Sequence, residues 1–385
     1  MSESMLRAGA RVDSLTGIRS LAALAVCFTH AAYWTGRYTP DLPGQFFARF
    51  EIGVALFFVL SGYLLFRPWV AVVFDRRPMP SVRRYSWHRA RRILPAYWIT
   101  VIAVFAIYRW WITDDSVFSH GWSGFVRNMT LTQVYGLGHL HSGLTQMWSL
   151  AAEVVYYVAL PPVAWLVVVV CRRRPRPIAA LVALGVFALI SPLWAVIVAN
   201  TDGIDPTARL WAPAFATWFI GGMMLAVAAR VVTRWHALLS VLVGVLAFQI
   251  SWTSLAGEPT ITPTGVGATI VKLLLYLVAA VALIAPLVLG ERGNWWDRLL
   301  SWRPLVAIGE ISYEFFCVHV MVLELMMRAL GFHVFSGSTG LVFVATTVVS
   351  LAVAWVLHRL TRPIWSPGHR RRINAPGSAF VGHTG

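Results

Sequence analysis

The chain has 385 residues, of which 58% are hydrophobic and only 12% are charged, and its mean hydropathy is +0.67. Soluble globular domains carry about 25% charged residues, so this composition excludes an ordinary soluble domain and indicates a polytopic membrane protein. The formal net charge of +16 is compatible with nucleic-acid binding, but the basic residues are distributed by membrane side, as described below. We therefore expect no nucleic-acid partner.

Ten apolar segments are each about 20 residues long, the length that crosses the hydrocarbon core of a bilayer. In chain order they are residues 18–36, 51–71, 93–112, 147–170, 178–199, 209–229, 237–255, 267–289, 305–330 and 339–359. The sequence therefore predicts an all-α polytopic membrane protein, a bundle of about ten transmembrane helices. We expect a cytoplasmic segment over 1–17, one transmembrane domain over 18–362 and a basic, disordered cytoplasmic tail over 363–385.

Arginines mark one side of the membrane. The two ends of the chain and the even-numbered connections hold 24 of the 32 basic residues, whereas the odd-numbered connections hold five. Basic residues accumulate on the cytoplasmic side of membrane proteins. Both termini are therefore expected in the cytoplasm, which agrees with an even number of spans, and we expect a multi-pass protein of the inner (plasma) membrane.

The first apolar segment carries Arg19 and His30. On a helix, their separation places the two side chains about 20° from eclipsed and roughly 16 Å apart along the axis, so both face one side. We expect Arg19 near one membrane surface and His30 near the middle of the membrane. A titratable side chain in hydrocarbon is costly and is usually kept for chemistry or transport. His30 is therefore the first candidate functional residue.

The second segment contains small residues among aromatic and aliphatic ones. Gly53, Ser61 and Gly62 lie within the stretch 51–66, and small side chains allow neighbouring helices to approach closely. Close helix packing is the expected role of these three residues.

The arginine-rich stretch before the third segment is typical of a topology signal, but its spacing also suggests a binding face. If residues 84–95 are helical, Arg84, His88 and either Arg91 or Arg92 share one face. Arginines on such a face can hold the phosphates of a cytoplasmic donor through charge-assisted hydrogen bonds. Both interpretations remain open from the sequence.

The long external connection, from about Thr113 to Gln146, contains His139 and His141 as a lone His-x-His pair. Structural zinc sites have four protein ligands and catalytic sites have three, and further ligands with recognisable spacing are missing here. We therefore expect no metal site.

The fourth segment begins with Trp148, Ser149 and Glu153. Ser149 can cap the helix N-terminus, and Glu153 can interact favourably with the helix dipole. A carboxylate about one turn below the external surface can also orient an acceptor hydroxyl group. We favour the second interpretation and expect these residues on the acceptor side.

The ninth segment carries Glu310, Tyr313, Glu314 and His319 within an apolar run. Three ionisable groups on one helix are too costly for exposure to lipid, so Glu310, Glu314 and His319 are expected to point into the bundle. For His319, a buried structural role and a functional role remain equally open.

Five motifs follow one another along the chain. They are Arg19 with His30, the stretch Gly53–Gly62, the stretch Arg91–Pro95, Trp148-Ser149-Leu150 followed by Glu153, and Ile311-Ser312-Tyr313 followed by His319. This pattern resembles the acyltransferase-3 family of integral membrane O-acyltransferases, and the resemblance covers the chain from Val12 to about Arg362. Relatives often have Tyr-Leu where this chain has Phe316-Cys317, so a role for that tyrosine is not carried over.

The resemblance implies ten core helices, a cytoplasmic acyl-CoA donor, a carbohydrate or lipid-linked acceptor and no tightly bound cofactor. It implies that His30 is the essential catalytic residue and Arg19 its essential partner, with Arg91 and Arg92 as second-choice donor contacts. Many family members carry a C-terminal extracytoplasmic hydrolase-like domain, so this chain is expected to be a standalone form. Acceptor-side or supporting roles are expected for Trp148, Ser149, Glu153, Tyr313, Glu314 and His319.

We therefore expect a membrane O-acyltransferase that moves a short acyl group, with acetyl favoured, from acyl-CoA to a hydroxyl group of an envelope glycan, glycolipid or secondary metabolite. An imidazole is the usual general base for a hydroxyl nucleophile, and it can also carry an acyl group transiently. Both roles are open for His30. The alternative is a transporter or flippase of a glycan or lipid, in which His30, Glu314 and His319 form a proton path. No internal repeat of the kind common in transporters is visible in the sequence, which favours the enzyme.

Overall fold

The computed structural model describes residues 12–112, 121–136, 140–260, 265–290 and 293–366. Within them, the regular elements are helices, so the predicted all-α class is confirmed. The α-helices are α2 (Asp13–Trp34), α3 (Leu42–Ala48), α4 (Ile52–Phe74), α5 (Val82–Trp110), α6 (Trp122–Met129), α7 (Trp148–Val170), α8 (Pro177–Ala188), α9 (Ile190–Asn200), α10 (Ala216–Ala228), α11 (Ala237–Ile250), α12 (Val266–Val288), α13 (Trp295–Leu300), α14 (Arg303–Glu310), α15 (Ser312–Ala329) and α16 (Thr339–Trp365). The 3-10 helices are η1 (Arg49–Glu51), η2 (Ser142–Met147), η3 (Pro206–Leu210), η4 (Ala212–Phe215) and η5 (Ser254–Ala256).

The helices at the two ends extend past the predicted boundaries of the transmembrane domain. α2 begins at Asp13 and α16 continues to Trp365, whereas the sequence suggested boundaries at 18 and 362. Most of the predicted terminal segments, residues 1–11 and 367–385, lie outside the described residues.

In the described part of the chain, eight helical stretches are long and apolar enough to cross a membrane, and α14 with α15 adds a ninth if that bent pair is one span. The seventh predicted segment, 237–255, contains the shorter helix α11, which is not long enough to count as a span. Helix α11 ends at Ile250 because the following chain turns toward the buried Arg49. The Arg49 Nε donates to the Ser251 carbonyl oxygen at 2.6 Å, and its Nη2 donates to the Ala256 carbonyl oxygen at 3.2 Å.

The predicted ninth span is not one straight helix. Helices α14 and α15 meet at a bend of 73°, where the Ser312 hydroxyl donates to the Gly309 carbonyl oxygen at 2.9 Å. Helix α14 crosses the start of α2 so closely that a Cβ atom on Gly309 would lie 1.9 Å from the Thr16 carbonyl oxygen. Glu310 and Glu314 therefore lie on different helices, and the prediction that they share one helix is wrong.

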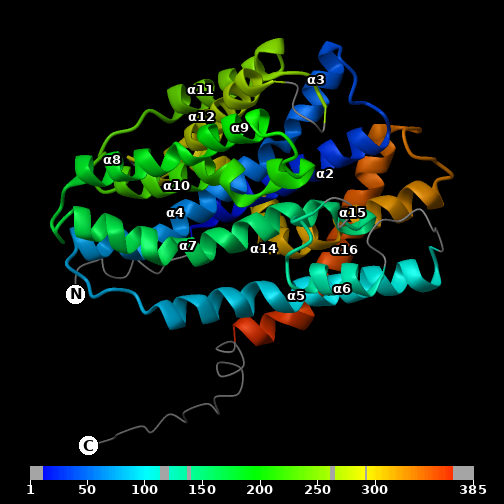
Figure 1. The fold of residues 1–385 in the computed structure, drawn as a ribbon, viewed down its shortest axis with the longest axis horizontal. Helices are drawn as coiled ribbons and strands as arrows, with labels where there is room; N and C mark the ends of the chain where they lie inside the picture. Colours follow the sequence, from blue (N-terminus) through cyan, green and yellow to red (C-terminus); the bar gives the residue numbers. More distant parts are fainter. Residues whose placement is uncertain (1–11, 113–120, 137–139, 261–264, 291–292, 367–385) are drawn as a thin grey trace, which may run out of the picture.

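Helices α2 and α4 run through the middle of the bundle (Figure 1). Helix α4 packs against α10, α12 and α7, while α2 packs against α14, α15 and α16. Because α2 is surrounded in this way, Arg19 and His30 are placed inside the bundle and not toward lipid.

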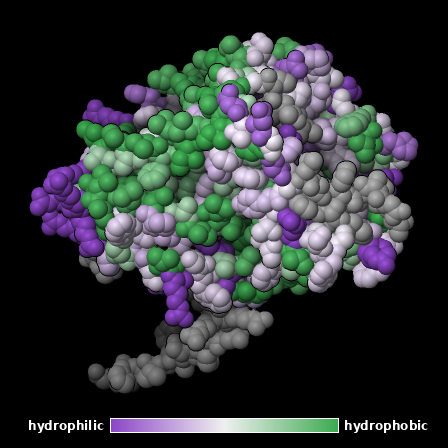
Figure 2. All heavy atoms as spheres, viewed as in Figure 1, coloured by the Kyte–Doolittle hydropathy of each residue, from purple (hydrophilic) through white to green (hydrophobic). Residues whose placement is uncertain are grey.

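The outer surface is suited to lipid. On α8, the side chains of Ile178, Val182 and Val186 are 76%, 62% and 64% exposed, and Figure 2 shows the apolar surface over this region bordered by hydrophilic side chains at the left end of the view. Contiguous exposed apolar patches of this kind are rare on soluble monomers. The protein is therefore a multi-pass membrane protein. We call the end of the bundle that holds residues 172–176, the start of α5 and the end of α16 the arginine-rich end.

Two of the predicted small residues do permit close helix packing. A Cβ atom on Gly53 would lie 2.3 Å from the Ala22 carbonyl oxygen of α2, and one on Gly62 would lie 1.9 Å from the Phe219 carbonyl oxygen of α10. This part of the prediction is confirmed. Ser61 is different, because its hydroxyl takes part in the site described below.

Gly62→Ala is expected to destabilise the bundle, because the added methyl group would collide with rigid backbone of α10. Overpacking of this kind costs typically about 1–3 kcal/mol, which thermal unfolding of the detergent-solubilised protein would detect. The matched control is Gly185→Ala on α8, where an added Cβ atom meets nothing within 4 Å. Equal melting temperatures for the two variants would show that the α4–α10 contact is looser than described.

Candidate active site

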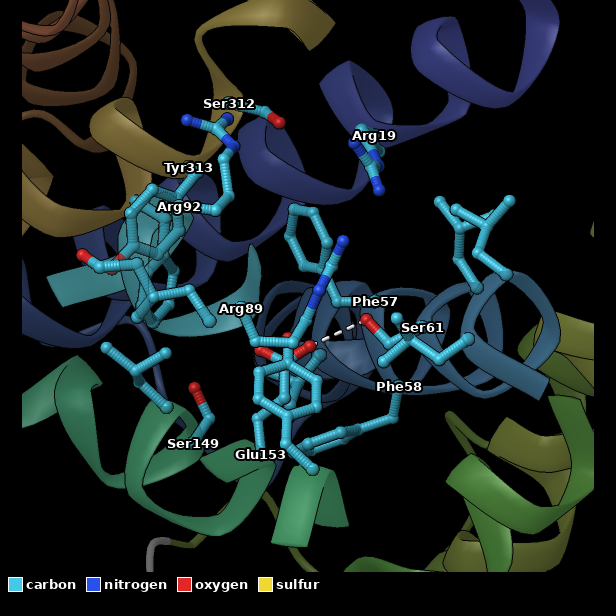
Figure 3. Close-up of a pocket in the computed structure, with 18 of the residues that line it drawn as sticks. Arg19, Phe57, Phe58, Ser61, Arg89, Arg92, Ser149, Glu153, Ser312 and Tyr313 are labelled. Atoms are coloured by element: carbon cyan, nitrogen blue, oxygen red, sulfur yellow. Dashed lines mark hydrogen bonds between the residues drawn. The ribbon is translucent and has the colours of Figure 1, made fainter. Parts of the chain in front are cut away.

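A pocket of about 420 Å³ lies between α2, α4, α5, α7 and α15, toward the arginine-rich end. We call it the arginine pocket, because its basic lining comes from Arg19 on α2 and His88, Arg89 and Arg92 on α5. Figure 3 shows Arg19, Arg89 and Arg92 around the same cavity, with the hydrogen-bonded Ser61 and Glu153 below Arg19 in this view. Arg19 and Arg92 are near enough for their positive charges to repel. An anion bound between them would relieve this repulsion.

Arg92 is held in place by a buried network. Its Nη1 donates to Glu314 Oε1 at 2.8 Å, and the Glu314 side chain is completely buried. The same oxygen accepts from His358 Nδ1 at 3.2 Å. The Arg92 guanidinium also lies 4.3 Å from the centre of the Trp365 ring and 5.4 Å from that of Tyr313. Glu314 is thus a partner of the arginine pocket and fixes the direction of Arg92.

Glu153 lies on the wall of the arginine pocket and accepts a hydrogen bond from the Ser61 hydroxyl at 2.6 Å. It was expected about one turn below the external surface. In the structure, η2 continues into α7, and the helical stretch that holds Glu153 starts at Ser142. Glu153 is consequently about three turns inside this stretch, beside the basic residues.

His30 pairs with His319 of α15. His319 is completely buried, and its Nδ1–H donates to the Phe316 carbonyl oxygen at 2.8 Å. The His30 Nδ1–H donates to the Val26 carbonyl oxygen at 2.8 Å and is 3.1 Å from His319 Nε2. A carbonyl oxygen can only accept, so each neutral ring carries its proton on Nδ1. This arrangement leaves the lone pair of His30 on Nε2, where it can take a proton or attack a carbonyl carbon.

The histidine pair lies behind the arginine pocket. Phe316 lines the pocket, and its ring centre is 5.9 Å from that of His319. His30 is four residues before the end of α2. Arg19 and His30 are therefore at different depths, with Arg19 in the pocket and His30 deeper, toward the opposite end.

Only some residues of the predicted donor face line the arginine pocket. His88 and Arg92 line the arginine pocket, but Arg84 and Arg91 do not. Arg84 is exposed, and Arg91 donates to the Ile364 carbonyl oxygen and lies over the Trp87 ring. Arg89 was not singled out from the sequence. Arg92 follows Arg89 by three residues and His88 by four, the spacing of one helix face, which was the signal available.

The remaining predicted residues separate into two places. Ser149 and Tyr313 line the arginine pocket, whereas Trp148 lines a second pocket beyond Val54, together with Glu51. Glu51 was not singled out from the sequence, although a carboxylate at the start of an apolar span was a usable signal. In the described residues, no group of three or more His, Cys, Asp and Glu side chains is placed to hold a metal ion. His139 lies outside those residues.

Comparison with known proteins shows the family of the chain. The model of the acyltransferase-3 family, described as an acyltransferase domain, matches residues 12–359. The chain is 27% identical over 383 residues to acyltransferase MdmB of Streptomyces mycarofaciens, with 90% of each chain covered. It is 24% identical to peptidoglycan O-acetyltransferase OatA of Listeria monocytogenes, over 82% of this chain and 50% of the relative. No solved structure matches significantly. The chain therefore belongs to the acyltransferase-3 family and is a multi-pass membrane acyltransferase.

Proposed function

We propose that the protein transfers an acetyl group from cytoplasmic acetyl-CoA to a hydroxyl group of an envelope glycan, glycolipid or secondary metabolite. The observation that carries the proposal is the arginine pocket at the arginine-rich end. Its lining residue Phe316 lies next to His319, the partner of His30. The positive-inside rule assigns the arginine-rich end to the cytoplasm, where acyl-CoA is made. An acetyl donor agrees with the name of the relative OatA, a peptidoglycan O-acetyltransferase.

The donor is proposed to bind with its phosphates at the basic side chains and its thioester toward Phe316. Arginine forms charge-assisted, often bidentate bonds to phosphate, and Arg19, Arg89 and Arg92 offer three such groups around one cavity. Glu314 keeps Arg92 in one orientation. Glu153 is the one acidic side chain in the described lining, against three arginines, so the pocket still has a positive balance.

In the proposed reaction, the acceptor hydroxyl oxygen attacks the thioester carbonyl carbon while His30 Nε2 takes the hydroxyl proton. The C–O bond forms, the C–S bond breaks, and the proton passes to the CoA sulfur, which leaves as a thiol. The imidazolium formed on the way keeps its Nδ1–H shared between the Val26 carbonyl and His319 Nε2. The same lone pair can instead attack the thioester, so that the C–S bond breaks, CoA leaves as a thiolate and His30 carries the acetyl group on Nε2 as an acetyl-imidazolium. The acceptor hydroxyl oxygen then attacks the acetyl carbon, the C–N bond breaks, and the hydroxyl proton passes to the thiolate.

The test uses the purified protein in detergent with acetyl-CoA labelled in the acetyl group and a fractionated cell extract. We expect label to appear in a product that releases acetate in mild base, as an O-acetyl ester does. Trp110→Ala, which removes an exposed tryptophan from α5, is the control for handling. Label that remains on CoA, while an extract component crosses reconstituted vesicles, would reject the proposal in favour of a transporter.

A further inference from the structure

A second pocket, of about 600 Å³, lies between α4, α9, α10 and α12. We call it the outer pocket, because Asp205 and Gly265, which lie in connections at the end of the bundle away from the arginines, are part of its lining. This volume is in the range of about 300–1,000 Å³ that holds compact organic ligands.

One side of the outer pocket is a continuous aromatic wall. The ring centres of Trp148 and Phe215 are 4.8 Å apart, those of Phe215 and Trp218 are 5.2 Å apart, and those of Trp218 and Tyr276 are 6.1 Å apart. The indole N–H of Trp218 donates to the Leu273 carbonyl oxygen at 2.9 Å. This ring therefore offers the pocket an apolar face and no free donor. Trp194, whose N–H donates to the backbone at 2.9 Å, lines the pocket in the same way.

A small polar cluster interrupts this apolar lining. Lys272 Nζ donates to Glu51 Oε1 at 3.0 Å, and the Tyr276 hydroxyl donates to the same oxygen at 3.1 Å. The pair is not sealed in the core, since the side chains of Glu51 and Lys272 are 39% and 22% exposed. An ion pair at membrane depth is costly when it faces lipid, and here it faces the outer pocket. It offers hydrogen bonds to a polar group of a bound molecule.

The polar cluster is on the side of the outer pocket nearest to the catalytic histidine. Thr29, the neighbour of His30, donates to the Ala48 carbonyl oxygen at 3.1 Å and so fixes α2 to the segment that carries Glu51. Val54, one turn after Glu51, lines both pockets. A molecule in the outer pocket would therefore lie next to the segment that is bonded to α2 beside His30, across Val54 from the arginine pocket.

The linings of the two pockets differ in charge, so the pockets favour different ligands. The charged side chains that line the described outer pocket are Glu51, Asp205, Arg209 and Lys272, two acidic and two basic. Such a lining does not select an anion, in contrast to the arginine pocket. We propose that the outer pocket binds the acceptor and that the acceptor is an uncharged, largely apolar ring compound with a hydroxyl group. This inference rests on the proposed transferase function and selects the metabolite class among its acceptors.

Lys272 gives a direct test, because it is the only lysine in the chain. An amine-reactive biotin ester should modify Lys272, and peptide mass spectrometry separates this product from the labelled N-terminus. We expect the butanol-soluble fraction of a cell extract to slow the modification at least fivefold, or by about 1 kcal/mol. The water-soluble glycan fraction and acetyl-CoA should leave the rate within about twofold. Lys272→Arg, which keeps the positive charge, is the control for the position of the label.

A kinetic test uses the aromatic wall. In Trp194→Ala, we expect the KM for the butanol-soluble acceptor to rise about tenfold relative to the Trp110→Ala control. The reason is that the acceptor loses its contact with one aromatic ring. The KM for acetyl-CoA should agree between the two variants. A rise in both KM values would mean that Trp194 supports the fold and not the acceptor.

The inference and the proposed function fail in different ways. Protection of Lys272 by the water-soluble glycan fraction, or transfer of label only to that fraction, would overturn the assignment of an apolar acceptor while leaving the transferase intact. Unchanged modification of Lys272 during active transfer would overturn the assignment of this pocket. Label that never leaves CoA would instead reject the transferase itself.

Discussion

His30→Ala is expected to lower kcat for acetyl transfer by about 10²- to 10⁴-fold, the usual contribution of a positioned general base. If the imidazole carries the acyl group, the loss is at least as large. The KM for acetyl-CoA should change little, because His30 lies behind Phe316 and does not line the arginine pocket. Single-turnover and steady-state transfer from labelled acetyl-CoA would measure both constants.

The control for this substitution is His333→Ala, which removes an exposed histidine and should retain full activity. His319→Gln and His319→Leu extend the test. An amide oxygen can still accept from His30 Nδ1–H, whereas leucine cannot, so the glutamine variant should keep the higher kcat. A His30→Ala variant with the wild-type rate would show that the histidine pair takes no part in the chemistry.

Arg89→Gln and Arg19→Gln are expected to raise the KM for acetyl-CoA by about 10- to 100-fold each, because a hydrogen bond to a charged group contributes about 1.5–3 kcal/mol. The effect should diminish at high ionic strength, where phosphate–arginine attraction is screened. Titration of acetyl-CoA at low and high salt measures both effects. These variants are preferable to substitution of Arg92, whose loss would leave the buried Glu314 without its ion-pair partner.

The matched control is Arg84→Gln, on the same helix as Arg89 and with the same change of charge. Arg84 is exposed and does not line the arginine pocket, so its KM for acetyl-CoA should stay near the wild-type value. Equal effects of the Arg84 and Arg89 substitutions would mean that the donor responds to the overall charge of this end of the protein. It would then not be held by the pocket.

Local features of the sequence were enough to predict the class of the protein. The lengths of the apolar runs gave an all-α membrane bundle, and the distribution of arginine distinguished its two ends. The spacing of Arg19 and His30 marked one helix as functional. Hydropathy and helical periodicity are properties of a short stretch of chain, so they can be read without knowing how the helices pack.

The sequence did not show which face of each helix contacts its neighbours. Residues 84–95 are helical as predicted, but the face that meets the pocket contains Arg89 and not Arg84 or Arg91. A helix start rich in arginine has no continuous apolar stripe to indicate which side is buried. The bend before Ser312 was also invisible, because it depends on the contact between Gly309 and Thr16.

By itself, the sequence determined the membrane fold, the arginine-rich end of the bundle, and the candidate residues His30 and Arg19. Only the tertiary structure decided which groups act together. His30 meets His319 across 289 residues, Arg92 meets Glu314 across 222, and Lys272 meets Glu51 across 221. Pairings over such separations follow from how whole helices pack, because no local interaction along the chain specifies them.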